Sequence, residues 1–318
     1  MSLLLSAGGW EAELAPQHGG LIAALRHHGR DVLRPLPSGT TEPLEASCFP
    51  LVPYCNRVDQ AGFDWQGETM TLPRNFAPEP HNLHGIGWHE AWEVVEHDAS
   101  SCLLRHDYAA AEGEGWPWSY RAEQRFALGE GGLRVDLMLT NRSASVMPAG
   151  LGFHPYFRRD DSTSVRFDAE EMIPVGDTMI PTGERAPADT FADWSEGTAL
   201  PPRLVDNCFT GWAGQVRIED VQGTITLRAS GAPHLHVYSP ADASALCFEP
   251  VTHEPDALNQ WPASMILLPP GTSATVTMQI DETPASPRPA TLGAQKRPGS
   301  LRASFFNLGQ STRQPSSP

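Results

Sequence analysis

The segment Leu133-Arg-Val-Asp-Leu-Met-Leu-Thr140 repeats an aliphatic residue at every second position. A period of two is typical of a half-buried β-strand, whose core face here holds Leu133, Val135, Leu137 and Leu139. Segments 223–229 and 274–280 repeat this period. Turn signals separate such segments, including Gly113-Glu-Gly115, Gly129-Glu-Gly-Gly132 and Pro269-Pro-Gly271. No segment sustains a helical period, so the sequence predicts an all-β fold, a large antiparallel β-sandwich.

The chain divides by composition near Glu282. Residues 283–318 hold five basic side chains and no acidic one, and they are dense in Pro, Ser, Gly and Thr. Such a segment has too few apolar residues to repay the entropy lost on ordering. We therefore expect one β domain over residues 1–282 and a disordered basic tail over residues 283–318.

Charge and cysteine content exclude several classes of protein. The formal net charge of −16 disfavours nucleic acid and anionic membranes as partners, because both attract basic surfaces. The five cysteines are scattered and form no Cys-x-x-Cys motif, which indicates buried thiols and neither a disulfide framework nor a zinc ribbon. The sequence has neither a convincing signal peptide nor an apolar run of about 18 residues. We expect a cytoplasmic monomer or homodimer.

Four strings rich in Gly, Pro and aromatic residues each carry one reactive side chain. They are Phe49-Pro-Leu-Val-Pro-Tyr-Cys-Asn-Arg57, Asn82-Leu-His-Gly85, Gly152-Phe-His-Pro-Tyr-Phe157 and Phe248-Glu-Pro-Val-Thr-His-Glu-Pro-Asp-Ala257. Their composition predicts fixed turns, which hold the side chains of Arg57, His84, His154 and Glu249. A carboxylate and an imidazole on a rigid scaffold suit proton transfer on a small neutral molecule.

The other histidines raise the possibility of a metal site. His234 and His236 share one face of a predicted strand, as in a cupin-like metal site, and His81 and His89 flank His84. The His89-Glu90 pair lacks the second histidine of a metalloprotease helix, because position 93 is Glu. We therefore expect no metal, and we expect His81, His89, His234 and His236 to lie on the surface or behind the site. Neither a Gly-x-Ser-x-Gly motif nor a phosphate loop is present.

A further string, Val205-Asp-Asn-Cys-Phe-Thr-Gly-Trp212, lies between the third and fourth of these four strings. Taken in order, the five strings resemble those of the aldose 1-epimerase (galactose mutarotase) family over most of residues 1–282. The resemblance implies a large antiparallel β-sandwich with its site in a cleft of one sheet. It also implies interconversion of the α and β anomers of an aldose without a cofactor.

The resemblance assigns roles to individual residues. Glu249 is expected to take the proton from the C1 hydroxyl, while His154 protonates the ring oxygen and His84 assists on that side. The residues expected to bind the sugar are Asn56, Arg57, Tyr156 and Asp206. Trp88, Trp92 and Trp212 are candidates for an apolar platform under the sugar, although each fits the aromatic core as well.

Two departures from the family pattern concern sugar specificity. Ile86 stands where a second Gly is common, and Arg158-Arg159 replaces the Asn that usually follows the His-x-Tyr-Phe motif. The two arginines favour a hexose-6-phosphate 1-epimerase as an alternative, because phosphate needs cations. A non-catalytic sugar-binding or sensing protein is a further alternative, as is a metal-dependent cupin-like enzyme.

Overall fold

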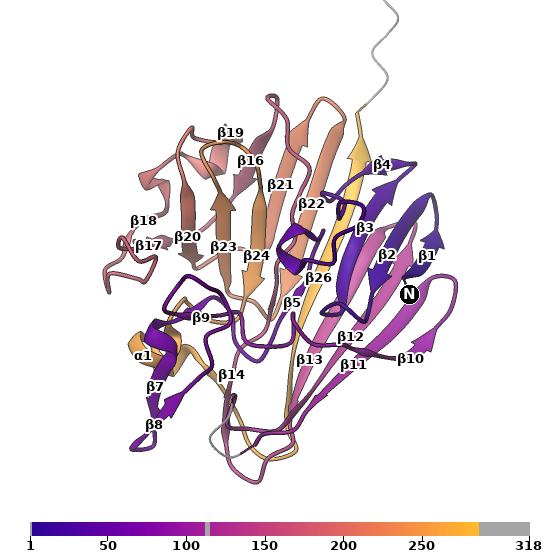
Figure 1. Cartoon of the computed structure of the whole chain (residues 1–318). Coiled ribbons are helices and arrows are strands. Elements are labelled where there is room, and N and C mark those ends of the chain that lie inside the picture. Colours follow the sequence, from indigo (N-terminus) through magenta and orange to yellow (C-terminus); the bar gives the residue numbers. More distant parts are fainter. Residues whose placement is uncertain (1, 112–114, 286–318) are drawn as a thin grey trace, which may run out of the picture. The chain divides into compact units, whose positions relative to one another are not determined.

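The computed structural model describes residues 2–111 and 115–285. Antiparallel sheets are the main regular structure of these residues, which confirms the predicted fold class (Figure 1). The largest sheet has nine strands, in the order β10 (Glu93–His97), β11 (Ser101–Tyr108), β12 (Tyr120–Gly129), β13 (Gly132–Asn141), β26 (Ser273–Pro284), β22 (Gly223–Ser230), β21 (Gln215–Asp220), β16 (Ser164–Phe167) and β19 (Thr198–Ala199).

A second sheet carries the motif strings. It has seven strands, in the order β18 (Ala186–Pro187), β17 (Glu171–Ile173), β20 (Val205–Thr210), β23 (His234–Ser239), β24 (Cys247–Val251), β15 (Gly152–Phe153) and β5 (Pro50–Leu51). Figure 1 shows β20, β23 and β24 side by side. They form the middle of this sheet.

Smaller elements complete the described part of the chain. One four-stranded sheet contains β1 (Leu3–Ala7), β2 (Trp10–Ala15), β3 (Leu21–His27) and β4 (Arg30–Asp31). Three strand pairs join β14 (Met147–Ala149) to β25 (Ile266–Leu268), β6 (Arg57–Val58) to β9 (Asn82–Leu83), and β7 (Gly62–Trp65) to β8 (Glu68–Thr71). Helix α1 (Ala257–Gln260) is short, and single 3₁₀ turns occupy Pro43–Glu45, Asp59–Ala61, Ala188–Thr190, Trp194–Glu196 and Pro262–Ser264.

The alternating segments form strands with the expected faces. Strand β13 pairs with β12 and β26 along its length, and its four alternating aliphatic side chains are fully buried, namely Leu133, Val135, Leu137 and Leu139. Segments 223–229 and 274–280 lie within β22 and β26, the latter of which ends at Pro284. The predicted tail and the turn at 113 lie mainly or wholly outside the described residues.

Aromatic side chains join the two large sheets. Phe167 of β16 lies 5.1 Å from Phe209 of β20 and 6.2 Å from Phe248 of β24, measured between ring centroids. Because successive side chains of a strand point to opposite faces, the residues beside Phe209 and Phe248 point away from this core. Glu249 therefore lies on the outer face of the seven-stranded sheet.

All five cysteines are buried and free, as the sequence predicts. Among the described residues, no helix has the length and apolar character needed to cross a membrane.

Candidate active site

A cavity of about 480 Å³ lies on the outer face of the seven-stranded sheet. Its lining comes from β20, β23 and β24 together with loops around β5, β9 and β15. All seven residues predicted from sequence line it, namely Asn56, Arg57, His84, His154, Tyr156, Asp206 and Glu249. The structure therefore brings the predicted residues together.

Strand register explains why residues far apart in sequence meet here. His236 of β23 lies directly opposite Glu249 on one side and Cys208 on the other. Directly opposed residues in antiparallel strands point to the same face of the sheet, so these three form a row on the outer face, and His236 and Glu249 of this row line the cavity. Asp206 lies two residues before Cys208 and points to the same face.

Glu249 lies at the floor of the cavity and is only 1% exposed. Its Oε1 is 3.2 Å from Nε2 of His154, and its buried Oε2 has no hydrogen-bond partner among the described residues. Burial raises the pKa of Glu249 to about 8, and the charge of Asp206 adds to this, while His236 and Arg57 oppose it. Glu249 is therefore a stronger base than an ordinary carboxylate.

His154 is held in a column of stacked rings. Its imidazole stacks on Phe49 at 4.6 Å and on Tyr156 at 4.7 Å, while Phe49 stacks further on Trp88. Burial, followed by the charge of His236, lowers the pKa of His154 to about 3. The column fixes the ring plane, so Nε2 stays directed at Glu249.

His84 and Asn56 hold each other through the backbone. Both residues have a left-handed backbone, with φ of 56° and 57°. The Asn56 amide donates to Nδ1 of His84 at 3.0 Å, and the His84 amide donates to the Asn56 carbonyl oxygen at 2.9 Å. Since Nδ1 accepts a hydrogen bond, a neutral His84 carries its own hydrogen on Nε2.

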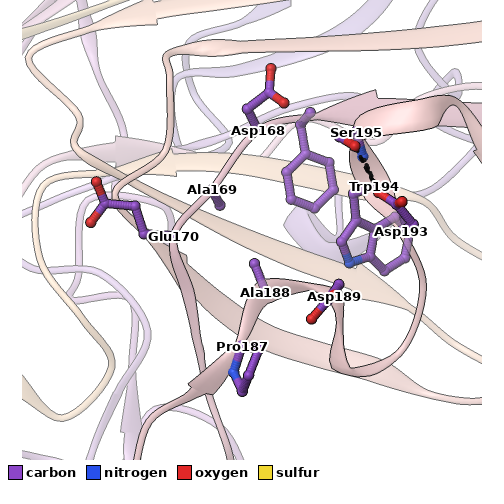
Figure 2. Close-up of a pocket in the computed structure, with 10 residues that line it drawn as sticks. Asp168, Ala169, Glu170, Pro187, Ala188, Asp189, Asp193, Trp194 and Ser195 are labelled. Atoms are coloured by element: carbon purple, nitrogen blue, oxygen red, sulfur yellow. Dashed lines mark hydrogen bonds between the residues drawn. The ribbon is translucent and has the colours of Figure 1, made fainter.

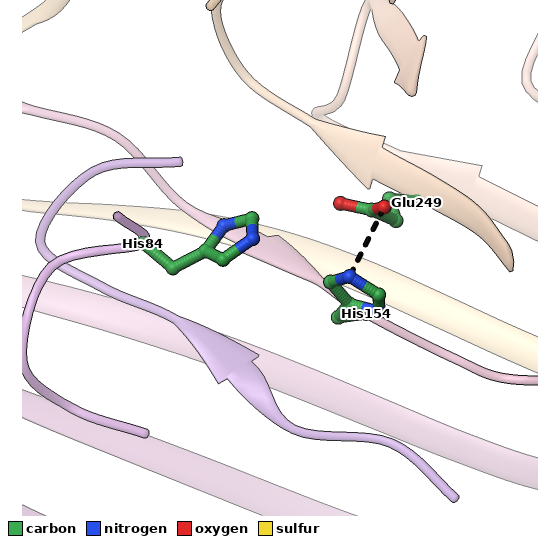
Figure 3. A group of neighbouring side chains, drawn as sticks. All are labelled: His84, His154 and Glu249. Carbon is green, nitrogen blue, oxygen red and sulfur yellow. Dashed lines mark ion pairs between the residues drawn. The ribbon is translucent and has the colours of Figure 1, made fainter. Parts of the chain in front are cut away.

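His84, His154 and Glu249 converge, with His84 facing the other two side chains (Figure 3). Ligand atoms of the three lie within 4.8 Å of one another, a spacing that a metal ion can use. However, the tautomer of His84 presents an N–H to this space, whereas a metal requires a free nitrogen lone pair. The arrangement suits hydrogen bonding to a substrate oxygen better than metal binding.

Arg57 and Asp206 form the opposite wall. The guanidinium of Arg57 makes two hydrogen bonds to Glu79, and its Nη1 lies 3.8 Å from Asp206. Burial alone would raise the pKa of Asp206, but the hydrogen bond with His236 and the nearby cationic charges bring that pKa below its usual value. Asp206 is therefore held as a carboxylate.

His236 is a site residue that the sequence interpretation placed wrongly, on the surface or behind the site. It is 3% exposed, lines the cavity, and lies 2.6 Å from Asp206 through Nε2. The signal was the His-x-His spacing in β23, which fixes the strand face but not the strand that pairs beside it. Glu79 of the cavity wall carried no signal in the sequence.

The remaining histidines and tryptophans lie outside the cavity lining. His81 is buried beside Asp59, His234 lies 3.7 Å from Glu254, and His89 is exposed. Trp88 and Trp92 are buried and Trp212 lies at another surface hollow, so none of the three provides a platform for a ligand in this cavity.

Arg158 and Arg159 make their contacts outside the cavity. Arg158 is bound to Asp220 and Glu282, and Arg159 donates to the Ser239 hydroxyl. Neither lines the cavity. The sequence argument that assigned these two arginines to a phosphate group is therefore wrong in its choice of residues.

A second hollow of about 320 Å³ lies between β16–β17 and the segment around Trp194 (Figure 2). Its carboxylates, Asp168, Glu170, Asp189 and Asp193, are exposed, and its lining contains no histidine. It therefore lacks the buried acid and base of the first cavity.

Comparisons with known proteins show which family and fold the chain matches. A family model described as aldose 1-epimerase matches residues 1–281. The uncharacterized protein YphB of Escherichia coli K12 is 32% identical over 294 residues, which cover 87% of this chain and 97% of YphB. A crystal structure from E. coli K12, provisionally described as an aldose 1-epimerase, superposes with a TM-score of 0.82 at 30% identity over 90% of this chain and 99% of the other. A galactose mutarotase-like protein from Clostridium acetobutylicum shares the fold, with a TM-score of 0.80 at 20% identity over 89% of this chain and 95% of its own.

Proposed function

The chain belongs to the aldose 1-epimerase family, and from this premise we propose that it interconverts the α and β anomers of a free hexose by acid–base ring opening and reclosure. Family membership makes it a sugar epimerase, an isomerase that acts on a small sugar. The observation that carries the proposal is the contact of 3.2 Å between His154 and Glu249 on the floor of a cavity large enough for a hexose.

The shifted pKa values place the shared proton on Glu249 in the free protein, so the reactive form requires its transfer to His154. With a pKa of about 8 for Glu249 and about 3 for His154, the pair holds one proton at neutral pH. In the reactive form that proton lies on His154, and Glu249 is a carboxylate. Glu249 then accepts the proton of the C1 hydroxyl while His154 donates its proton to the ring oxygen, and the C1–O5 bond breaks.

Ring opening leaves the pair neutral, with the proton on Glu249. Burial favours this neutral form, because both charges lose hydration in the site. Rotation about C1–C2 then presents the other face of the aldehyde to O5. On reclosure, the O5 hydroxyl returns its proton to His154 as O5 attacks C1. Glu249 gives its proton to the oxygen of C1, which becomes the new C1 hydroxyl, so protons balance over a turnover.

The other lining residues orient the sugar. The Nε2–H of His84 can donate to the ring oxygen or to a neighbouring oxygen, since Nδ1 is already occupied by Asn56. Asp206 retains one oxygen for a sugar hydroxyl, because His236 binds the other. Asn56, Arg57 and Tyr156 complete the wall around the reacting atoms.

The test is the decay of optical rotation after fresh α-glucose or α-galactose is dissolved with the protein. We expect Glu249→Gln and His154→Asn each to lower kcat by about 10²–10⁴-fold. The control is Glu184→Gln, which changes an exposed carboxylate outside the cavity. An active Glu249→Gln protein would refute the mechanism. Calorimetric sugar binding by a wild-type protein without any rate effect would instead indicate a sugar-binding protein.

We infer a second candidate substrate, a phosphorylated hexose, from Arg34. Arg34 lines the cavity, with its guanidinium 3.8 Å from the ring centroid of Tyr156. It donates to two backbone carbonyls but has no ion-pair partner among residues 2–111 and 115–285, and its Nε is buried without a hydrogen bond. An unpaired guanidinium can bind phosphate. If glucose 6-phosphate is preferred over glucose, Arg34→Gln should remove that preference.

A further inference from the structure

His236 has contacts that a structural histidine does not need. It lies on β23 between the strands that carry Asp206 and Glu249, and it is almost completely buried. Its Nε2 is 2.6 Å from Asp206, and both of its ring nitrogens lie 3.5 Å from the side-chain amide of Asn56. The distance to Asp206 is short, as hydrogen bonds between charged partners are.

Apart from Arg34, the charges around the cavity form pairs. Arg57 is held by Glu79 through two hydrogen bonds, so its charge is largely compensated. This leaves two buried carboxylates, Asp206 and Glu249, and two imidazoles in contact with them, His236 and His154. When both imidazoles are protonated, each carboxylate has one cationic partner.

The groups that face His236 come from several elements. They are Asp206 and Cys208 from β20, Glu249 from β24, Arg57 from β6, and His84 and His154 from the loops. Burial alone would lower the pKa of His236, but Glu249 and Asp206 together bring that pKa above its usual value. Cys208 adds no charge, because burial raises the pKa of its thiol well above the usual value.

We propose that His236 is a positioning residue: as an imidazolium it fixes Asp206 and supplies the positive charge beside Glu249 that keeps Glu249 available as a carboxylate. The expected effect of His236 on turnover rests on the proposed function. Its electrostatic part does not, because the ionisation of Glu249 can be measured without a substrate.

The test variant is His236→Gln, which keeps a donor toward Asp206 but removes the charge. The matched control is His234→Gln, a change on the same strand face that lies outside the cavity lining. The first readout is the carboxyl ¹³C NMR titration of Glu249, assigned with Glu249→Gln. We expect the acid ionisation constant of Glu249 to fall about tenfold in His236→Gln and to stay unchanged in His234→Gln.

The second readout is the pH dependence of kcat/KM for mutarotation. The limb that falls with pH reports loss of the pair's single proton as Glu249 ionises, so it should move to higher pH in His236→Gln by the same factor, with KM changed less than threefold. A Gln variant with the wild-type titration of Glu249 and the wild-type pH profile would overturn the proposal, because a hydrogen bond alone would then suffice.

The outcomes separate the two proposals. One outcome is that the wild type fails to accelerate mutarotation of any sugar while the titration midpoint of Glu249 still shifts in His236→Gln. In that case the proposed function fails and the electrostatic role of His236 stands. If His236→Gln does not fold, the imidazole of His236 is titrated by ¹⁵N NMR in the wild type and in Asp206→Asn. Its midpoint should fall in Asp206→Asn, and an unchanged midpoint would overturn the pairing.

Discussion

At the scale of one residue, the buried carboxyl of Glu249 lowers the free energy of unfolding of the protein once it ionises. Its carboxyl is buried, one oxygen lacks a partner, and the pKa lies near 8 instead of the ordinary 4.5. Because the native state keeps a proton that the unfolded state releases, the contribution of Glu249 to wild-type stability falls as pH rises from about 4.5 to about 8. A neutral amide at this position does not titrate.

We therefore predict that Glu249→Gln gains stability relative to the wild type as pH rises. The gain should be small at pH 4.5, grow across this interval and level off above pH 8, with an upper bound of about 5 kcal/mol. Urea unfolding of both proteins at pH 5 and pH 9 measures it, with Glu184→Gln as the control for the change in net charge. A stability difference that is the same at both pH values would contradict the prediction.

At the scale of elements, the meeting of β15 and β24 sets the distance between His154 and Glu249, the proposed acid and base. Gly152 of β15 pairs with Val251 of β24, one strand carrying the chain to His154 and the other carrying Glu249. A Cβ at Gly152 would lie 2.8 Å from the Pro250 carbonyl oxygen and 3.0 Å from the Cys55 sulfur. Backbone cannot yield to such a contact without a shift of the strands.

We predict that Gly152→Ala separates His154 from Glu249. A displacement of about 1 Å costs on the order of 10²-fold in rate, and the strain should lower stability by about 1–3 kcal/mol. The matched control is Gly129→Ala, where an added Cβ meets nothing within 4 Å. Optical-rotation kinetics and thermal unfolding check both variants, and a Gly152→Ala protein with wild-type kcat would show that the strands adapt.

The same elements show what sequence can and cannot predict. Alternation predicted β13, β22 and β26 because a period of two depends only on neighbouring residues. The motif residues were found because each string marks its own turn. His236 was misplaced because its role depends on β23 pairing beside β24, and strand order does not follow from spacing within one strand.

At the scale of the whole molecule, Arg158 joins the site loop to the nine-stranded sheet. Its guanidinium binds Asp220 at the end of β21 at 2.7 Å and Glu282 of β26 at 2.6 Å, and it donates to the Asp31 carbonyl oxygen at 3.1 Å. Sequence adjacency to His-Pro-Tyr-Phe had suggested phosphate binding. The Arg158 side chain instead points away from the cavity toward the nine-stranded sheet, where it supplies the counter-charge for two buried carboxylates.

We predict that Arg158→Gln lowers the free energy of unfolding by about 3–5 kcal/mol, since it leaves Asp220 buried without its cation and leaves Glu282 with only Arg30 and His27 as partners. The control is Arg166→Gln on an exposed position of β16, which should change stability by less than about 0.5 kcal/mol. Below the unfolding temperature, the ratio of kcat/KM for glucose 6-phosphate to that for glucose should equal the wild-type ratio. A selective fall in kcat/KM for glucose 6-phosphate, with stability unchanged, would indicate that Arg158 recognises the substrate. It would contradict the role of Arg158 as the link between the site loop and the large sheet.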